Sequence, residues 1–514
     1  MTERRGWCPT LFEPMPSGDG LLVRVKPPGG RMSAEAARSL AEAAARCGNG
    51  IIELTSRANL QIRGLSPESV GPFAAAMIAC GLANADADAE RRRNVMASPL
   101  AGDDRSLAPD TETIAAAIER GLIEERRFAT LPPKFGILVD GGGVLPLDGI
   151  GADIAVRSAG PTFALSLDWD TLAVACAPEH AALSALRLAH AFLDLATTLS
   201  RKPRRMRELV QAVGAEAVFR AASMHAFLVI RLHNETVMAA VSPRLSGSEL
   251  RLADANYSPS CPGLTRASIS CPLNEPHKSW PVLGPAIGRT RGMAGSSPAM
   301  TKLGSSPRTV EFERSEPDNH GIRLGITDWD RSAALLNPIG YSPYPGLHRG
   351  AVGLGLPFGQ MTSDTLTALA DVATRFGDGM LRTTPWRAVL VAEVAENTAR
   401  GLREAAERAG MIVDPADPRR NVVACPGRPA CASGSVAARA DAAFLAASGV
   451  LPSGIVHVSG CSKGCAHPGP AAFTLVGANG RYSTVRDGSA ADVPEIEGLS
   501  IAEAAARIKT AIAA

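Results

Sequence analysis

Residues 30–50 read GRMSAEAARSLAEAAARCGNG, and residues 359–379 read GQMTSDTLTALADVATRFGDG. The two stretches align without gaps at a constant shift of 329, and eight of the 21 positions are identical. Each contains a residue suited to cap a helix, Ser33 or Thr362. Apolar residues then recur at three- and four-residue spacing up to a glycine pair, which is a stop signal for helices. Each stretch therefore predicts one amphipathic helix.

The segments that flank these helices also correspond. Apolar runs at residues 21–25 and 352–356 precede the helices, and longer runs at residues 51–62 and 380–391 follow them. Each copy therefore predicts a strand, a helix and a second strand. Chance similarity between two alanine-rich helices would not explain why caps, glycines and strands all match. The sequence predicts a duplicated chain with pseudo-twofold architecture.

The overall composition limits the class of protein. At 514 residues the chain has room for about three domains of roughly 150 residues each. Its net charge of +2 gives no general attraction to nucleic acid or to an anionic membrane. We find no signal peptide near the first residues and no run of the ~20 apolar residues that cross a bilayer. We therefore expect a cytoplasmic protein that binds neither nucleic acid nor membrane.

The region between the two copies changes character along its length. Residues 111–121 and 181–198 predict helices, and residues 135–139 and 226–232 predict strands. Residues 258–315 are rich in Pro, Gly, Ser and Arg and have no periodicity, so we predict a flexible insertion there. Two cysteines in it, Cys261 and Cys271, have no predicted pairing.

Four cysteines near the end of the sequence form two close pairs. Cys425 and Cys431 lie in ACPGRPACASG, and Cys461 and Cys465 lie in SGCSKGCAHPG, which gives the spacing C-x5-C-x29-C-x3-C. The small residues around both pairs allow the backbone to fold around inorganic sulfide. Structural zinc usually uses shorter spacings, disulfides fit a reducing compartment poorly, and four unrelated buried cysteines are a further alternative. The pattern favours an iron–sulfur cluster.

This cysteine pattern resembles the cluster motif of the sulfite/nitrite reductase superfamily, in which a 4Fe–4S cluster lies beside a tetrapyrrole. The resemblance covers nearly the whole chain except the predicted insertion. It implies an α+β fold with two ferredoxin-like half-domains and two larger α+β lobes, and it makes Cys465 the cluster-bridging position. We place the first half-domain at 1–75, the first lobe at 76–245, the insertion at 258–315, the second half-domain at 316–405 and the iron–sulfur lobe at 406–514.

A tetrapyrrole carries up to eight carboxylates, so its pocket needs Arg and Lys side chains. A single basic residue is more often a solvated surface charge. The string ELTSRANLQIRG, however, resembles the macrocycle-binding strand of the reductases, and three other short motifs resemble segments that present cations to the substrate. The resemblance implies the following binding residues: Lys26, Arg57, Asn59, Gln61, Arg93, Asn94 and Lys134.

One departure from the reductase pattern affects the expected activity: Gly136 stands where the reductases have a second lysine. In the second copy, Trp386 stands at the position of Arg57, an asymmetry that is expected when one half carries the active pocket and the other is structural. The strings GWCPTLFEPMPSGDGLLVRVKPPGG and HVSGCSKGCAHP most resemble the precorrin-3B synthases of aerobic cobalamin biosynthesis. That resemblance implies O₂-dependent monooxygenation of a tetrapyrrole substrate, precorrin-3A, with C20 hydroxylation and formation of a γ-lactone.

No G-x-G-x-x-G dinucleotide fingerprint follows a predicted strand, so we expect a separate reductase or ferredoxin as electron donor. The resemblance to the synthases also implies a mononuclear non-haem iron, for which His457 and His467 are candidates and structural histidines the alternative. No catalytic acid or base can be assigned. A sirohaem-dependent sulfite or nitrite reductase is the alternative enzyme. A non-catalytic tetrapyrrole-binding iron–sulfur protein is the other alternative.

Overall fold

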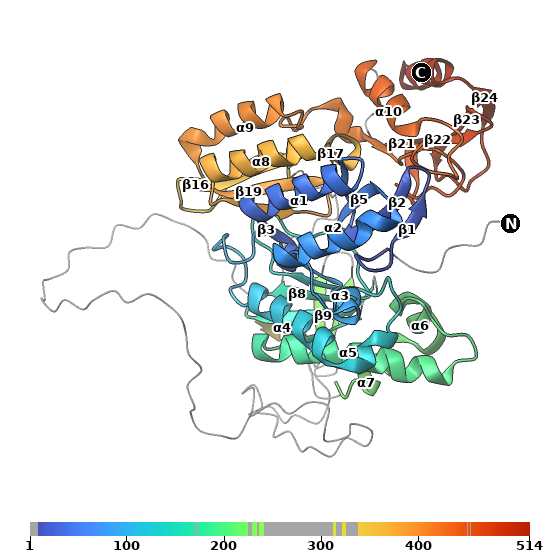
Figure 1. The fold of residues 1–514 in the computed structure, drawn as a ribbon. Helices are drawn as coiled ribbons and strands as arrows, with labels where there is room; N and C mark the ends of the chain where they lie inside the picture. Colours follow the sequence, from blue (N-terminus) through green and yellow to red (C-terminus); the bar gives the residue numbers. More distant parts are fainter. Residues whose placement is uncertain are drawn as a thin grey trace, which may run out of the picture.

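The computed structural model describes residues 9–224 and 338–513, except residues 169, 171, 450 and 453, together with the backbone of four strands between residues 229 and 324. The predicted insertion at 258–315 lies outside the described residues apart from the strand Phe312–Arg314, and Cys261 and Cys271 lie outside them too. Figure 1 shows four sheets with their helices. Within the described part of the chain, no helix is long and apolar enough to cross a membrane.

The first half-domain is a five-stranded sheet with two helices. Its strand order is β1-β2-β5-β4-β17. Helix α1 (Ala34–Cys47) begins where expected, since the Ser33 hydroxyl accepts the N–H of Ala36 at 3.1 Å. Helix α2 is Pro67–Ala79. The strands are β1 (Met15–Ser17), β2 (Gly20–Val25), β5 (Leu60–Leu65), β4 (Ile51–Leu54) and β17 (Gln360–Thr362).

The second half-domain repeats this arrangement with the order β15-β16-β19-β18-β3. Helix α8 (Ser363–Phe376) is capped by Thr362, whose hydroxyl accepts the N–H of Thr365. Helix α9 is Ala399–Arg408. The strands are β15 (Gly340–Pro343), β16 (Arg349–Gly355), β19 (Ala388–Ala395), β18 (Met380–Thr383) and β3 (Arg31–Ser33).

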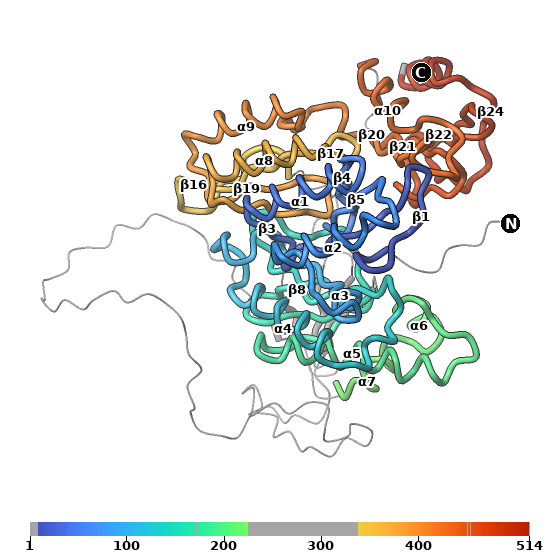
Figure 2. The backbone as a smooth tube through the Cα atoms, viewed as in Figure 1, coloured from blue at the N-terminus to red at the C-terminus, as the bar shows by residue number. Residues whose placement is uncertain are grey.

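The two half-domains exchange one strand each. Strand β3, from the first repeat, pairs with β18, whereas β17, from the second repeat, pairs with β4. Two backbone bonds show the symmetry: the Ala34 N–H donates to Gly379 O at 2.8 Å, and the Ser363 N–H donates to Gly50 O at 2.9 Å. Helices α1 and α8 lie side by side over one continuous hydrophobic core (Figure 2). The predicted α+β architecture with duplicated ferredoxin-like half-domains is confirmed.

One expectation was wrong. Residues 51–62 and 380–391 were each expected to form a single strand, but each folds as a hairpin, β4–β5 and β18–β19. The first hairpin turns at Thr55, whose N–H donates to the Asn59 carbonyl, and at Ala58, which has a positive φ. A turn of this kind normally carries glycine, so an alanine gave no signal in the sequence.

The first lobe combines a nine-stranded sheet with helices on its surface. The predicted helices at 111–121 and 181–198 are confirmed as α4 (Thr111–Glu124) and α5 (Pro178–Thr198). The other helices are α3 (Ala87–Arg92), α6 (Met206–Val213) and α7 (Ala215–Ala221). In spatial order the strands are β13 (Phe312–Arg314), β14 (Gly321–Leu324), β12 (Thr236–Ala240), β11 (Val229–His233), β10 (Leu172–Cys176), β9 (Thr162–Leu167), β8 (Ile154–Ala159), β7 (Ile137–Asp140) and β6 (Val95–Ala97).

The last sheet, its two helices and the loops between them form a lobe that we call the cysteine lobe. The four predicted cluster ligands lie in its loops. Its first three strands run parallel and the last two antiparallel. The strands are β20 (Val422–Ala424), β21 (Val456–Ser459), β22 (Ala471–Ala478), β23 (Arg481–Gly488) and β24 (Ile496–Leu499), and the helices are α10 (Ala438–Ala447) and α11 (Ile501–Ala513). Short 3₁₀ helices occur at η1 (Pro28–Gly30), η2 (Arg126–Thr130), η3 (Pro357–Gly359), η4 (Glu396–Thr398) and η5 (Pro418–Asn421).

Candidate functional site

The two cysteine pairs follow neighbouring parallel strands. Cys425 comes directly after β20, and Cys461 comes two residues after the end of β21. Since parallel strands end at the same edge of a sheet, their loops meet there. The Cys425 N–H donates to the Val458 carbonyl, and the Gly460 N–H donates to the Cys425 Sγ at 3.0 Å. Strand order thus brings the cysteine pairs to one place, although 29 residues separate them in sequence.

The four thiols interact electrostatically with one another. Burial raises the pKa of the Cys425 thiol, and the nearby Cys431 and Cys461 raise it further. Burial also raises the pKa of Cys465, and the other three cysteines add to the effect. Positive charge from a metal would reverse this direction, since a bound metal stabilises the thiolate form. The thiols therefore form one group.

Glycines allow the two cysteine loops to approach closely. A Cβ on Gly460 would lie 3.1 Å from the Gly427 Cα and 3.3 Å from the Cys425 Sγ. Gly427 itself has φ +64, and a Cβ there would lie 2.4 Å from the Ala438 N. Larger residues would push the loops apart, which explains the glycine-rich sequence around each pair.

Four cysteine thiols are the donor set that a 4Fe–4S cluster uses. No group of three or more His, Cys, Asp or Glu side chains in the described ranges is placed to hold one metal ion. A single zinc would need its thiolates at about 2.3 Å. In a 4Fe–4S cluster each thiolate binds a different iron, so the ligands stand farther apart. Four neighbouring thiols, with a backbone N–H already directed at one sulfur, match a cluster in ligand type and number.

The histidine pair does not fit a mononuclear iron site. His457 lies on β21 and is 0% exposed, and among the described residues neither of its ring nitrogens has a hydrogen-bond partner. Its ring makes an edge contact with the ring of His467, with centroids 5.8 Å apart. Burial, together with His467 and Arg387, lowers the pKa of His457 to about 4. Two histidines without a carboxylate are short of the ligand set that non-haem iron uses.

A cavity of about 420 Å³ lies between the first half-domain and the first lobe. It brings together two predicted binding residues, Lys26 and Asn94, and adds Arg24. Lys134 is exposed and directly follows Pro133, which is part of the wall. The complete lining is Pro9, Thr10, Glu13, Pro14, Arg24, Lys26, Arg91, Asn94 and Pro133. The cavity is basic on one side, as a carboxylate ligand requires.

Lys26 and Arg93 are buried, and both are bonded within the protein. The Lys26 ammonium donates to the carbonyls of Glu90 and Arg91 at 2.9 and 3.1 Å. Arg93 forms ion pairs with Glu90 at 2.6 Å and Glu119 at 2.7 Å, and it donates to the Lys26 carbonyl. Arg93 does not line the cavity. Arg93 instead connects Lys26 to α3, because it donates to the Lys26 carbonyl and pairs with Glu90 of that helix.

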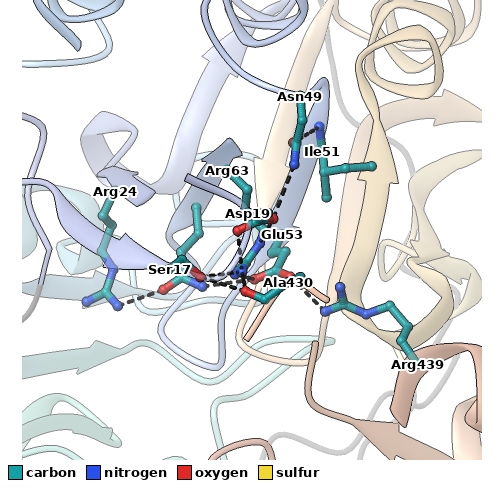
Figure 3. A network of polar contacts seen from close by, with 10 residues as sticks. Ser17, Asp19, Arg24, Asn49, Ile51, Glu53, Arg63, Ala430 and Arg439 are labelled. Atoms are coloured by element: carbon teal, nitrogen blue, oxygen red, sulfur yellow. Dashed lines mark hydrogen bonds and ion pairs between the residues drawn. The ribbon is translucent and has the colours of Figure 1, made fainter. Parts of the chain in front are cut away.

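A row of polar side chains crosses the first sheet beside the cavity. Arg24 donates to the side-chain amide oxygen of Gln61 at 3.0 Å, and the Gln61 side-chain NH₂ donates to the Glu53 carboxylate at 3.2 Å. Glu53 also accepts from Arg439 of α10 at 2.8 Å and pairs with Arg63 at 3.4 Å (Figure 3). The row therefore connects the cavity wall to the cysteine lobe.

Sequence reasoning found Gln61 in this row but missed Glu53, Arg63 and Arg439. Gln61 and Arg63 are two residues apart on β5 and so share a face, a signal that was available. Arg57 and Asn59 lie in the turn between β4 and β5, where both backbone N–H groups donate to the Thr55 hydroxyl. Neither of these two residues is part of the cavity lining.

Comparison with known proteins agrees with this architecture. The nitrite/sulfite reductase ferredoxin-like half domain matches residues 13–80 and 346–409. A precorrin-3B synthase from Sinorhizobium sp is 28% identical over 503 residues, covering 96% of this chain and 84% of that protein. A ferredoxin–nitrite reductase from Synechococcus elongatus is 31% identical over 144 residues, covering 27% of this chain and 28% of that protein.

Among solved structures, the NirA protein of Mycobacterium tuberculosis has the same fold. It matches with a TM-score of 0.59 at 17% identity, covering 95% of this chain and 79% of that chain. The matched half-domain ranges coincide with the two copies found in the sequence. The chain therefore carries the nitrite/sulfite reductase ferredoxin-like half domain twice, and over almost its whole length it is similar to a precorrin-3B synthase.

Proposed function

We propose that the protein is a precorrin-3B synthase, an oxidoreductase of cobalamin biosynthesis that oxygenates precorrin-3A. The observation that carries the proposal is the basic cavity beside Arg24, which hydrogen bonds link to the cysteine lobe. The similarity to the Sinorhizobium enzyme over 96% of the chain supports the choice of substrate. The proposal includes a cytoplasmic location and a separate reductase or ferredoxin as electron donor.

In the proposed reaction one atom of O₂ enters the tetrapyrrole as the C20 hydroxyl, and the ring A acetate closes a γ-lactone. The other oxygen atom leaves as water, which requires two electrons from the donor and two protons. A 4Fe–4S cluster on Cys425, Cys431, Cys461 and Cys465 would supply one-electron transfer. The described residues offer no fitting set for a mononuclear iron, so we assign no step to one.

The protein's own contribution is to hold the substrate. Arg24 and Asn94 would bind acetate and propionate groups at the cavity, and Lys134 would reach the same groups from its rim. Lys26 would contribute charge while its ammonium stays fixed on the Glu90 and Arg91 carbonyls. Arg57, Asn59 and Gln61 would bind other carboxylates along the first sheet. Fixing several arms of the macrocycle decides which carbon faces the oxidant.

A sirohaem-dependent sulfite or nitrite reductase is the second candidate, because a nitrite reductase is 31% identical to part of the chain. Gly136 weakens this candidate. Its N–H donates to the Asp153 carboxylate at 2.9 Å, and it supplies no cation where the resemblance expects one. A protein that binds a tetrapyrrole without chemistry is the third candidate.

An absorption spectrum and a turnover experiment separate the three candidates. The protein purified without oxygen should give a broad iron–sulfur shoulder, and strong sirohaem bands would instead identify the reductase. Incubation with precorrin-3A and a one-electron reductant, followed by O₂, should yield a product that has gained one oxygen atom. Binding without any O₂-dependent product would leave only the non-catalytic protein. Cys465→Ser is the matched control, since it should keep the fold and lose the product.

A further inference from the structure

We propose that Arg63 and Arg387 are positioning residues for the cluster, each holding one cysteine loop from a different half-domain. The inference rests on the proposed cluster at the four cysteines. It assigns to both half-domains a role in retaining the cluster. Each arginine donates to a backbone carbonyl next to a cysteine, so both act through the backbone of the loops.

Arg63 reaches the loop of the first cysteine pair. It lies on β5, is 3% exposed, and donates through Nη2 to the carbonyl of Ala430, the residue before Cys431. The Ser17 hydroxyl donates to the same carbonyl at 2.7 Å, and the Gly18 N–H donates to it at 3.1 Å. One carbonyl thus accepts from three donors, all of which come from the first half-domain. Figure 3 shows two of them, Ser17 and Arg63, beside Ala430.

Arg63 is held in place by two carboxylates. Asp19 accepts from its Nε at 2.9 Å and from its Nη2 at 3.0 Å, and Glu53 pairs with its Nη1 at 3.4 Å. A planar guanidinium with five N–H donors can bond all these acceptors at once, which a lysine cannot. The two carboxylates orient the guanidinium so that its Nη2, which also donates to Asp19 and to the Ser17 hydroxyl, faces the Ala430 carbonyl.

The turn between β1 and β2 packs against the loop of the first cysteine pair without room for a side chain at Gly18. A Cβ on Gly18 would lie 2.2 Å from the Pro429 carbonyl oxygen, so the turn between β1 and β2 packs directly on the loop backbone. Any side chain at this position would have to move the loop that carries Cys431. The first half-domain and the first cysteine pair therefore form one rigid contact.

Arg387 makes the corresponding contact from the second half-domain. Its Nη2 donates at 2.9 Å to the carbonyl of Ala466, the residue after Cys465. Arg387 has φ +56 and is the last residue of the turn between β18 and β19, and a Cβ on Gly359 would lie 2.8 Å from its Cδ. Glycine at position 359 therefore leaves the space in which the side chain passes toward the cysteine lobe.

The two contacts fix both loops against the half-domains. A thiolate keeps its iron only while its loop holds the sulfur in place, because hydrolysis and chelators compete for an iron whose ligand moves away. Loss of either arginine leaves a loop carbonyl without its charged donor. We expect faster cluster loss and an altered cluster signal.

Arg382 provides a matched control. It is 1% exposed and pairs with Asp103 at 2.9 Å and with Asp378, so it is as buried and as charged as Arg63. Its hydrogen bonds go to Asp103, Asp378 and the Met380 carbonyl, none of which belongs to a cysteine loop. A purely structural role for Arg63 would give the same result in both variants.

The experiment compares Arg63→Gln, Arg387→Gln and Arg382→Gln in the full-length protein with its cluster assembled. Iron and sulfide content, the rate of absorbance loss in an iron chelator, and the EPR spectrum of the reduced cluster are measured. We expect cluster loss at least tenfold faster than wild type in the first two variants, with shifted EPR g-values. Arg382→Gln should lower the unfolding temperature but keep the wild-type loss rate and spectrum. Arg63→Lys should restore part of the retention.

Wild-type loss rates and spectra in both Arg63→Gln and Arg387→Gln would overturn the inference, and so would equally fast loss in Arg382→Gln. If Arg63→Gln does not fold, Ser17→Ala removes one donor to Ala430 and should still speed cluster loss; a wild-type rate there would overturn the Arg63 contact. A wild-type protein that holds no cluster would instead refute the proposed function, so the two failures are distinguishable.

Discussion

The two half-domains share a backbone but use the same sheet face differently. In the first, the paired residues across the strands are Arg24, Gln61 and Glu53; in the second, at the same registers, they are Gly353, Leu390 and Arg382. The first row is polar and reaches Arg439 of the cysteine lobe. In the second row, Leu390 packs in an apolar cluster with Leu100, Leu107, Leu145 and Tyr344.

The hairpin tips differ in the same way. Trp386 packs against two apolar clusters, one within the first lobe and one shared by the first lobe and the second half-domain, whereas its counterpart Arg57 is a half-buried cation. Arg387, the counterpart of Ala58, reaches the cysteine lobe. One strand–helix–hairpin unit can therefore serve as a binding wall or as a packing surface. A few residues on one sheet face determine which of the two roles it has.

The largest effect is expected at the cysteine lobe that the polar row faces. Cys465→Ser should abolish the cluster and all turnover, because a 4Fe–4S cluster uses four cysteine thiolates. Iron analysis and the absorption spectrum measure the loss. Cys80→Ser in the first half-domain, outside the cysteine loops, is the control and should keep both. A brown, active Cys465→Ser protein would refute the assignment of this ligand.

Removing the carboxylate of the polar row should be the most costly change to stability. Glu53→Ala leaves Arg63 and Arg439 without their shared partner, and breaking a buried pair costs about 3–5 kcal/mol. Denaturant unfolding of the metal-free protein measures it. Leu390→Ala, at the register position of Gln61 in the second row, should also destabilise but leave cluster retention intact. Glu53→Ala should in addition weaken cluster retention, because Glu53 helps to hold Arg63 in place. Equal cluster retention in Glu53→Ala and Leu390→Ala would contradict this difference between the two rows.

Truncating the side chain at each hairpin tip should separate packing from binding. Trp386→Ala removes an aromatic side chain from two apolar clusters and should lower the free energy of unfolding by about 3 kcal/mol. Arg57→Ala should change it by less than about 1 kcal/mol and weaken tetrapyrrole binding instead. Unfolding curves and binding titrations of both variants test this. A binding defect confined to Trp386→Ala would reverse the assignment.

The lowered pKa of His457, to which Arg387 of the second half-domain contributes, makes the stability of the cysteine lobe depend on pH. The folded pKa of His457, about 4, lies below the ordinary value near 6.5, so the unfolded chain binds more protons as pH falls. The stability contribution is therefore complete above pH 6.5 and is lost toward pH 4. Between pH 6.5 and 5 the loss should be about 2 kcal/mol.

Metal-free protein isolates this effect from cluster loss. His457→Phe should flatten the pH dependence of unfolding, because no titrating group remains at that position. Arg387→Gln should reduce it only slightly, since burial is the main cause of the lowered pKa. An unchanged pH profile in His457→Phe would show that another group is responsible.

The smallest effect on the fold is expected at Gly136. A Cβ there would meet only the Asn94 carbonyl oxygen at 3.5 Å, an ordinary contact, so Gly136→Lys should change stability by less than about 1 kcal/mol. The new cation should tighten sulfite or nitrite binding several-fold, measured by titration. Gly136→Gln, with a similar length and no charge, is the control. Equal affinities in the two variants would contradict a role for charge.

Local signals in the sequence predicted the fold well. Ser33 and Thr362 cap their helices as expected. The cysteine pattern predicted a single site, and the parallel strands β20 and β21 bring the two cysteine loops together. The turn at Ala58 escaped detection because an alanine occupies a backbone conformation that normally signals glycine. The polar row escaped because Glu53 and Arg439 come from elements 386 residues apart, and only tertiary packing makes them neighbours.

The exchange of β3 and β17 has a consequence for the history of the chain. Each half-domain completes its sheet with an edge strand that belongs to the other repeat. A single repeat on its own would expose an unpaired edge, and a second identical molecule could fill it by lending the same strand. A homodimer of single-repeat chains would satisfy every such pairing. Gene fusion would then make the exchange permanent and free each copy to specialise, which the two sheet faces have done.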